Sequence, residues 1–160
     1  MRNRWGYALV LAALLVGVSA TSVAAEGVVT HYGARLSGGN EVPAVDTDAW
    51  GFAQFKLNRD GTVLTYRLFA IGLEDGTASH IHLGAPGANG GVVVWLFGPV
   101  AGGTDVNGIA ARGEITAEDL VGALAGQPLS ALVEQIEAGN AYVNFHTVAH
   151  PGGEIRGQVE

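Results

Sequence analysis

The sequence predicts an all-β protein, an antiparallel Greek-key sandwich or barrel of about eight strands. Short runs of alternating apolar and polar residues recur along the chain, and glycine-containing turns separate them. Regularly spaced short strands with turn signals between them are typical of sandwiches and barrels. The expected strands are 28–36, 51–58, 62–71, 77–83, 91–97, 108–115, 141–147 and 154–159.

The stretch between residues 116 and 138 departs from this strand pattern. Thr116 is followed by Glu118 and Asp119, which is typical of a helix N-cap with acidic residues in the first turn. From residue 128 to 138 the apolar side chains have helical spacing, and Gly139 would end the helix. The sequence therefore predicts one or two short helices here.

The first 25 residues are typical of a secretory signal peptide. Arg2 and Arg4 precede an uncharged run from residue 7 to 18, and small residues before and at Ala25 suit signal peptidase. An uncleaved membrane anchor is the alternative, although the run is short for a span. We expect a signal peptide at 1–25, a folded domain at 26–160 and a secreted or periplasmic protein.

Composition narrows the partners that can be expected. The chain carries 15 acidic and eight basic residues, a formal net charge of −7, which repels nucleic acid and anionic membranes. It has no cysteine, so it can form no disulfide, accept no lipoprotein anchor and offer no thiolate. A metal ion would be held by histidine and carboxylate. The oligomeric state is not predicted.

Two histidines one residue apart are the first candidate site. His80 and His82 flank Ile81, and successive strand residues point to opposite faces. If Ile81 enters the core, both histidines lie on the outer face of the sandwich. Their Cβ atoms would be about 6–7 Å apart, so one ion could join them with a ligand from a neighbouring strand. A polar strand surface without a metal is the alternative.

The two last strands add further polar side chains to that face. His146 shares the polar side of strand 141–147 with Tyr142 and Asn144. His150 precedes Pro151 and is either a further ligand or a turn residue. The predicted metal ligands are His80, His82 and His146, with Arg156, Glu154 and His150 close by. For one ion to bind, the three ring nitrogens must lie within about 3–4 Å of one another. No catalytic residue is predicted.

Other segments suggest structural roles. The glycine-rich segment 84–91 lacks the Lys-Ser/Thr ending of a phosphate-binding loop and precedes a strand, so it predicts a turn. Glu41 is expected to be an ordinary loop residue. Trp50 and Trp95 are interpreted as core or strand-edge aromatics rather than as a platform for sugars.

Several motifs in order resemble the CHRD domain, a module named after chordin and common in secreted bacterial proteins. They are NEVP (40–43), NRDGT (58–62), SHIHLGAPGANGGVVVWLF (79–97), GEITAEDL (113–120) and AGNAYVNFHTVAHPGGEIRGQV (138–159). The resemblance runs from about residue 32 to 159 and implies a β-sandwich or barrel in an extracellular or periplasmic protein.

A fainter similarity is to copper/zinc superoxide dismutase. His80-Ile81-His82 looks like its paired copper ligands, YVNFH like the strand with a later ligand, and GGEIRGQV like its closing strand. This similarity implies copper ligands at His80, His82 and His146, with Arg156 nearby. The metal-bridging histidine, the zinc ligands and the disulfide have no counterpart. A mononuclear copper-binding or copper-buffering module agrees better with these differences than a dismutase does.

Three functions follow as hypotheses. The first is a secreted CHRD-domain protein that binds a transition metal, copper or alternatively zinc, through a three-histidine site on the outer face of the sandwich. The second is a metal-free extracellular module that binds other proteins. The third is a redox enzyme of the superoxide dismutase kind.

Overall fold

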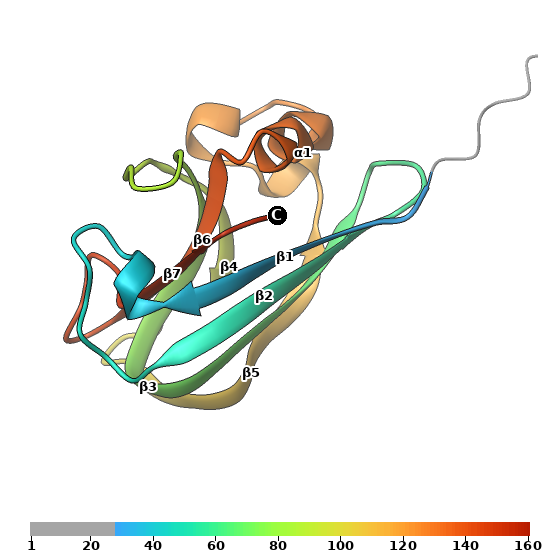
Figure 1. The fold of residues 1–160 in the computed structure, drawn as a ribbon. Helices are drawn as coiled ribbons and strands as arrows, with labels where there is room; N and C mark the ends of the chain where they lie inside the picture. Colours follow the sequence, from blue (N-terminus) through green and yellow to red (C-terminus); the bar gives the residue numbers. More distant parts are fainter. Residues whose placement is uncertain (1–27) are drawn as a thin grey trace, which may run out of the picture.

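The computed structural model describes residues 28–160 (Figure 1), so the predicted signal peptide lies outside the described residues. The elements are, in chain order, β1 (Thr30–Ser37), the 3-10 turn η1 (Gly38–Asn40), β2 (Trp50–Leu57), β3 (Leu64–Leu83), β4 (Val92–Phe97), β5 (Thr104–Ile115), the 3-10 turns η2 (Ala117–Asp119) and η3 (Gly122–Leu124), α1 (Leu129–Glu137), β6 (Ala141–Thr147) and β7 (Ile155–Gln158).

The strands form one antiparallel sheet whose pairings close into a ring. The first half of β3 pairs with β2, and its second half pairs with β6. The strands β1 and β7 connect β2 to β6 and so complete the ring: β1 pairs with both β2 and β7, and β7 pairs with β6. β4 and β5 extend the sheet from β3. The all-β prediction is confirmed, with the architecture of a barrel-like sandwich (Figure 1).

The structure has seven strands among residues 28–160 rather than the expected eight or so, because two of the expected strands form one continuous strand. The runs 62–71 and 77–83 belong to the single 20-residue strand β3. Between them the chain bends: Gly72 and Asp75 have positive φ, and the register with β5 shifts on both sides of Leu73. The glycines and acids near residue 75 look like a turn in the sequence, but the backbone stays paired through the bend.

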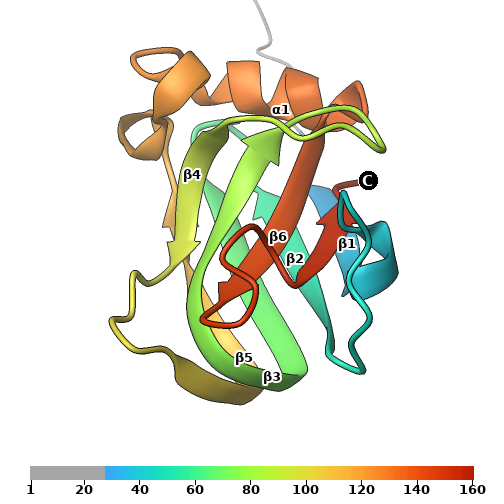
Figure 2. The ribbon, with the colours of Figure 1, turned by 90° about the vertical axis from the view of Figure 1, so that its left-hand side faces the viewer.

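The helical prediction between 116 and 138 is confirmed in outline. Thr116 caps η2, and Asp119 completes a capping box with it, so the predicted N-cap starts a 3-10 turn instead of an α-helix. The α-helix is α1, which is followed by Gly139 at φ 71°. α1 lies across one end of the strands (Figure 2) and buries Leu129, Leu132 and Ile136 in the common core.

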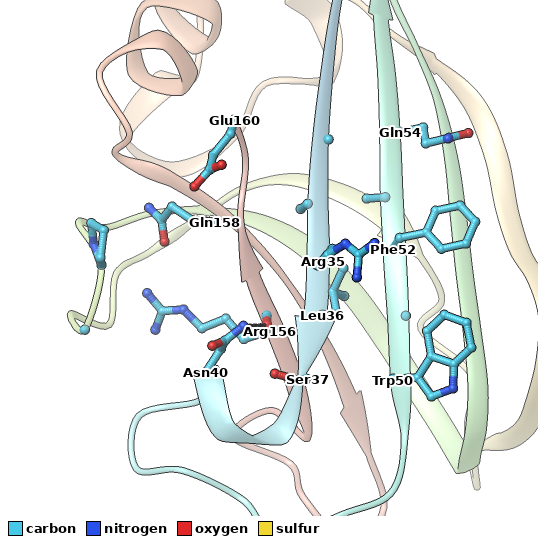
Figure 3. A pocket seen from close by; sticks show the side chains of 16 residues that line it. Arg35, Leu36, Ser37, Asn40, Trp50, Phe52, Gln54, Arg156, Gln158 and Glu160 are labelled. Carbon is cyan, nitrogen blue, oxygen red and sulfur yellow. Dashed lines mark hydrogen bonds between the residues drawn. The ribbon is translucent and has the colours of Figure 1, made fainter.

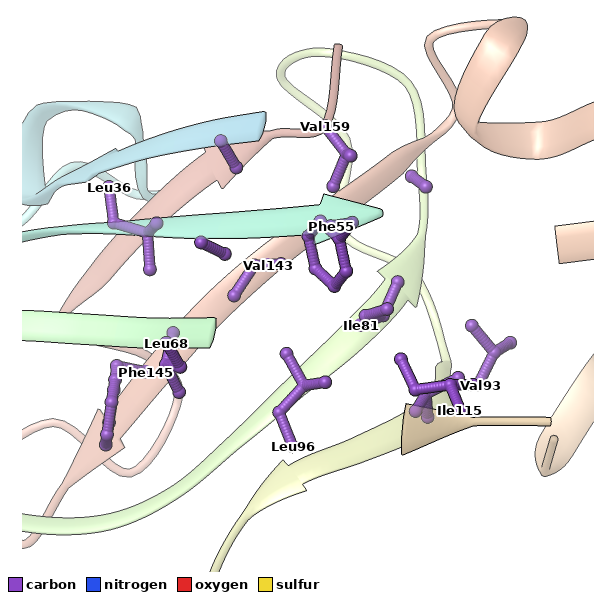
Figure 4. Close-up of a cluster of buried hydrophobic side chains, with 14 of the residues drawn as sticks. Leu36, Phe55, Leu68, Ile81, Val93, Leu96, Ile115, Val143, Phe145 and Val159 are labelled. Atoms are coloured by element: carbon purple, nitrogen blue, oxygen red, sulfur yellow. The ribbon is translucent and has the colours of Figure 1, made fainter. Parts of the chain in front are cut away.

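The core fills the inside of the strand ring. Side chains from separate strands point toward one another there, among them Leu36, Phe55, Leu68, Ile81 and Val143 (Figure 4). Each is at most 2 % exposed, as expected for close-packed apolar residues. Because alternate residues of these strands enter the core, the intervening residues lie on the outside of the ring, where the candidate site is found.

Candidate metal centre

The three predicted ligands come together on the second half of β3 and on β6. His80 and His82 lie on β3, and His146 lies on the neighbouring strand β6. Ile81 is fully buried in the core, which turns both flanking histidines to the outside of the ring. In the register, His146 stands opposite Ala78, one step along the same face from His80. The strand adjacency that residue spacing alone leaves open is therefore present.

The site is buried, although it lies on the outer side of the sheet. His80 and His82 are only 6 % and 7 % exposed, and His146 is half-buried. The segments 84–91 and 148–154 cover the rings, since the carbonyls of Gly90 and Pro151 contact the side chains of His82 and His146. The histidines therefore lie on the predicted outer face, but loops form a second layer over that face, which strand alternation cannot predict.

Backbone carbonyls set the protonation of two of the rings. His82 Nδ1 lies 2.9 Å from the carbonyl oxygen of Gly90, and His146 Nδ1 lies 3.0 Å from that of Pro151. Because a carbonyl oxygen only accepts hydrogen bonds, Nδ1 of each ring is the donor. In the neutral rings Nε2 then carries a free lone pair, which is the form that ligates a metal ion.

Two ring nitrogens in this cluster are buried without a partner. Neither His80 Nε2 nor His82 Nε2 has a hydrogen-bond partner among residues 28–160. His80 Nδ1 lies 3.1 Å from His146 Nε2 and donates to it in the neutral, metal-free cluster. A buried polar atom left unpaired costs about 1–3 kcal/mol, so such atoms in a folded protein call for an explanation.

Electrostatics keep the three imidazoles neutral. Burial, followed by the neighbouring His146 and His82, lowers the pKa of His80 from 6.5 to about 4. Burial is also the largest effect on His82 and His146 and lowers both pKa values, against the opposing effect of their carbonyl hydrogen bonds. At neutral pH all three rings are uncharged, which metal binding requires.

The spacing of the cluster is close to what one ion needs. One nitrogen from each ring can be chosen so that all three lie within 4.8 Å of one another. Two nitrogens bound at about 2.0–2.1 Å to a tetrahedral ion lie about 3.3–3.4 Å apart. His80 Nδ1 and His146 Nε2, at 3.1 Å, are slightly closer to each other than this separation. The widest pair exceeds the expected range of about 3–4 Å, so a ring must move by about an ångström or more to close on an ion.

A stack of flat side chains supports His82 from behind. The ring of Tyr142 lies nearly parallel to that of His82, with centroids 4.9 Å apart and planes 8° apart. The guanidinium carbon of Arg156 lies 3.4 Å from the centroid of the Tyr142 ring. Arg156 is almost fully buried and donates to the carbonyl oxygen of Ala88 and to Asn89 Oδ1. It therefore ties the covering segment 84–91 to β7.

The other two residues expected near the site have different roles from the ligands. Glu154 is buried but accepts hydrogen bonds from the hydroxyls of Thr47 and Thr147, at 2.8 and 2.7 Å. It thus holds the segment before β2 against β6, and its hydrogen bonds go to these hydroxyls rather than to a histidine ring. His150 is half-buried in the turn before β7 and is not part of the three-histidine cluster.

Two residues of the site were not foreseen as part of it. Trp95 pairs with His80 across β3 and β4 and sets its ring edge-on to His80, with centroids 4.2 Å apart. Glu41, expected as a loop residue, is buried, and Oε1 has no partner among the described residues. Burial raises the pKa of Glu41 to about 7, against the lowering effect of Arg156. Trp95 could have been found from the pairing of its strand with that of His80, whereas no local pattern marks Glu41.

A groove of about 1290 Å³ borders the centre on the β1 side. It runs along β1, β2 and β7, and Arg156, Gln158 and Asn40 point into its left-hand part in Figure 3. Arg156 lines this groove and also stacks on Tyr142, but the histidines do not line it. The cluster and the groove are therefore neighbours that share one side chain.

Fold and site together describe an all-β module with a buried three-histidine cluster that could hold a metal ion. The model of the CHRD domain family matches residues 32–159, and the chain belongs to this family. CHRD domains are generally extracellular, so membership supports a secreted module. No helix among residues 28–160 is long and apolar enough to cross a membrane. Searches of curated proteins and of solved structures found no match.

Proposed function

We propose that this CHRD-domain protein binds one transition-metal ion through a ring nitrogen each of His80, His82 and His146. The observation that carries the proposal is the set of unpaired nitrogens: His80 Nε2 and His82 Nε2 are buried without partners beside His146. An ion bound through such a nitrogen would give its lone pair a partner and so remove the cost of leaving it buried and unpaired. The hydrogen bonds from Nδ1 of His82 and His146 keep two of the ligands oriented for it.

Copper is the proposed metal, with zinc as the alternative. Three neutral imidazoles suit Cu(II) and Zn(II), and the chain has no cysteine to favour a thiolate-bound metal. Among divalent ions of the first transition row, Cu(II) binds a given nitrogen site most tightly. The proposal includes secretion through cleavage after Ala25, which would place the site in a compartment outside the cytoplasm.

Isothermal titration of Cu(II) and of Zn(II) into the metal-free protein tests the proposal. The wild type should bind one ion, and His82→Ala should weaken binding by more than about 10-fold, since even a residue that only orients a ligand changes affinity by about 10–100-fold. Circular dichroism of each variant shows whether the fold is kept.

His31→Ala is the matched control because His31 is exposed on β1, away from the cluster. His150→Ala is a second control, which tests whether a histidine outside the cluster contributes to binding. Both variants should bind as the wild type does. Equal, weak binding by the wild type and His82→Ala would contradict the metal proposal and favour a metal-free module that binds other proteins.

A further inference from the structure

An exposed surface that is separate from the metal centre lies on the outer face of β1, β2, β5 and the first half of β3. Trp50 and Phe52 project from β2 to the same side (Figure 3), and Phe69 lies beside them on β3. The centroid of Phe69 is 4.8 Å from that of Phe52 and 5.8 Å from that of Trp50. Ile109 of β5 pairs with Phe69. Trp50 is 48 % and Ile109 54 % exposed, so a contiguous apolar surface faces solvent.

The same face gathers the positive charge of an acidic protein. Five basic side chains are exposed among residues 28–160, and four of them lie here: Arg35, Lys56, Arg67 and Arg112. The fifth is Arg59, in the turn between β2 and β3. Two acidic residues border this face: Glu114 at one end on β5, and Glu160, which is paired with Gly33 of β1 and lines the same groove as Arg35. We call the surface formed by these four basic residues with Trp50, Phe52 and Phe69 the basic aromatic face.

Two of these arginines are placed where they repel each other. Arg67 of β3 and Arg112 of β5 are direct cross-strand partners. Like charges directly opposite in a sheet are destabilising, so this pair costs stability in the free protein. An anionic group bound between the two side chains would reverse that effect, because a guanidinium binds a carboxylate through two parallel hydrogen bonds.

We propose that the basic aromatic face binds an acidic polysaccharide, a chain of sugar units that carry carboxylates. The guanidinium groups of Arg67 and Arg112 would bind the carboxylates. Trp50, interpreted from the sequence as a core or strand-edge aromatic, would instead pack with Phe52 and Phe69 against the apolar faces of the sugar rings. The arginine pair and the aromatic side chains are neighbours along β3, since Arg67 and Phe69 are two residues apart and point to the same face. A polymer whose every unit carries both a carboxylate and an apolar ring face matches this pattern.

Other anionic partners match the face less well. The aromatic side chains stand on paired strands rather than on a protruding loop, which disfavours their insertion into a bilayer. A simple polyanion such as an acidic peptide would need the arginines but would leave the aromatic rings without a role. The test therefore has to separate charge from stacking.

Binding of the wild-type protein to oligogalacturonate, to neutral dextran oligomers and to polyglutamate tests the proposal. The protein should bind oligogalacturonate, more weakly as salt is added, and should bind dextran and polyglutamate at least about tenfold more weakly. Arg67→Gln with Arg112→Gln should weaken oligogalacturonate binding by about tenfold or more, and Trp50→Ala should do the same. All side chains changed are exposed or half-exposed, and thermal unfolding monitors the fold.

Arg59→Gln is the matched control, since it removes an exposed positive charge outside the face. It should leave binding within about twofold of the wild type. The proposal is overturned if the wild type does not bind oligogalacturonate, if polyglutamate binds as tightly, if Trp50→Ala binds unchanged, or if Arg59→Gln weakens binding as much as the double variant. His82→Ala, measured with chelator present, should bind the polymer as the wild type does, which keeps this proposal separate from the metal site.

Discussion

At the scale of single residues, Ile81 decides where the two neighbouring histidines point. It is fully buried in the ring, so His80 and His82 must share the opposite face. This much could be predicted from the sequence, because strand alternation depends on neighbouring residues only. The burial of the histidine rings could not be predicted from the sequence, because Gly90 and Pro151 cover them and belong to loops with no periodic pattern.

Glu41 gives a prediction for the pH dependence of stability. Burial raises its pKa from 4.5 to about 7, although Arg156 lowers it in part. The folded state therefore holds this proton more tightly than the unfolded state, so the stabilising contribution is complete below pH 4.5 and is lost as pH rises through 7. Glu41→Gln, which stays neutral, should be more stable than the wild type at pH 8 and similar to it at pH 4, as measured by urea unfolding.

The control for this variant is Glu74→Gln, which changes an exposed carboxylate on β3. It should show no comparable difference between the two pH values. A Glu41→Gln variant that is destabilised by the same amount at both would contradict a buried, readily protonated Glu41.

His80 gives a prediction of the opposite sign. Burial and the adjacent His146 and His82 lower its pKa from 6.5 to about 4, so its stabilising contribution is complete above pH 6.5 and is lost as pH falls toward 4. In metal-free Glu41→Gln protein, urea unfolding should show falling stability from pH 7.5 to 5. Adding His80→Gln should reduce that fall, and an unchanged slope would mean that His80 is not buried as a neutral ring.

At the scale of elements, the segment between β3 and β4 is more than a turn. Its Gly90 carbonyl orients His82, its Asn89 side chain donates to the carbonyl of Val42, and its Ala88 carbonyl accepts from Arg156. The sequence predicted a connection here and not a phosphate site. Its role as the cover of the centre depends on contacts with residues about 45 to 70 positions away, as with Val42 and Arg156, which no local pattern encodes.

Gly90→Ala tests whether this segment positions the metal ligands. A Cβ at Gly90 would overlap the carbonyl oxygen of Leu83, so the backbone must shift and carry the Gly90 carbonyl away from His82. We expect weaker metal binding, by about 10-fold or more, as for loss of other groups that orient ligands. Gly91→Ala is the control, because a Cβ there meets nothing within 4 Å. Equal titration curves for the two variants would show that the cover does not act on the ligands.

At the scale of the whole molecule, the ring of strands closed by α1 supplies the rigidity on which the site depends. Leu132 of α1 is fully buried in the core, whereas Ser130 of the same helix is exposed. Leu132→Ala should lower the free energy of unfolding by about 2–5 kcal/mol, and Ser130→Ala should change it by less than about 0.5 kcal/mol. Urea unfolding measures both, and similar values for the two would mean that α1 is not part of the common core.

The long-range arrangement explains what sequence reasoning left open about the site. The three ligands could be named from residue type and alternation, but His146 is 64 positions beyond His82. Their meeting depends on β6 pairing with the second half of β3, which follows from the closure of the whole ring. The two expected strands form one long strand, β3, whose first half pairs with β2 and whose second half pairs with β6.

The most direct test of the three-histidine centre is a crystal structure of the copper-loaded protein with anomalous scattering recorded at the copper edge. The account predicts one strong anomalous peak in the cluster, about 2.0–2.1 Å from a ring nitrogen of each of His80, His82 and His146. Copper bound only at exposed positions such as His31, with the cluster empty and His80 Nδ1 still bonded to His146 Nε2, would contradict it.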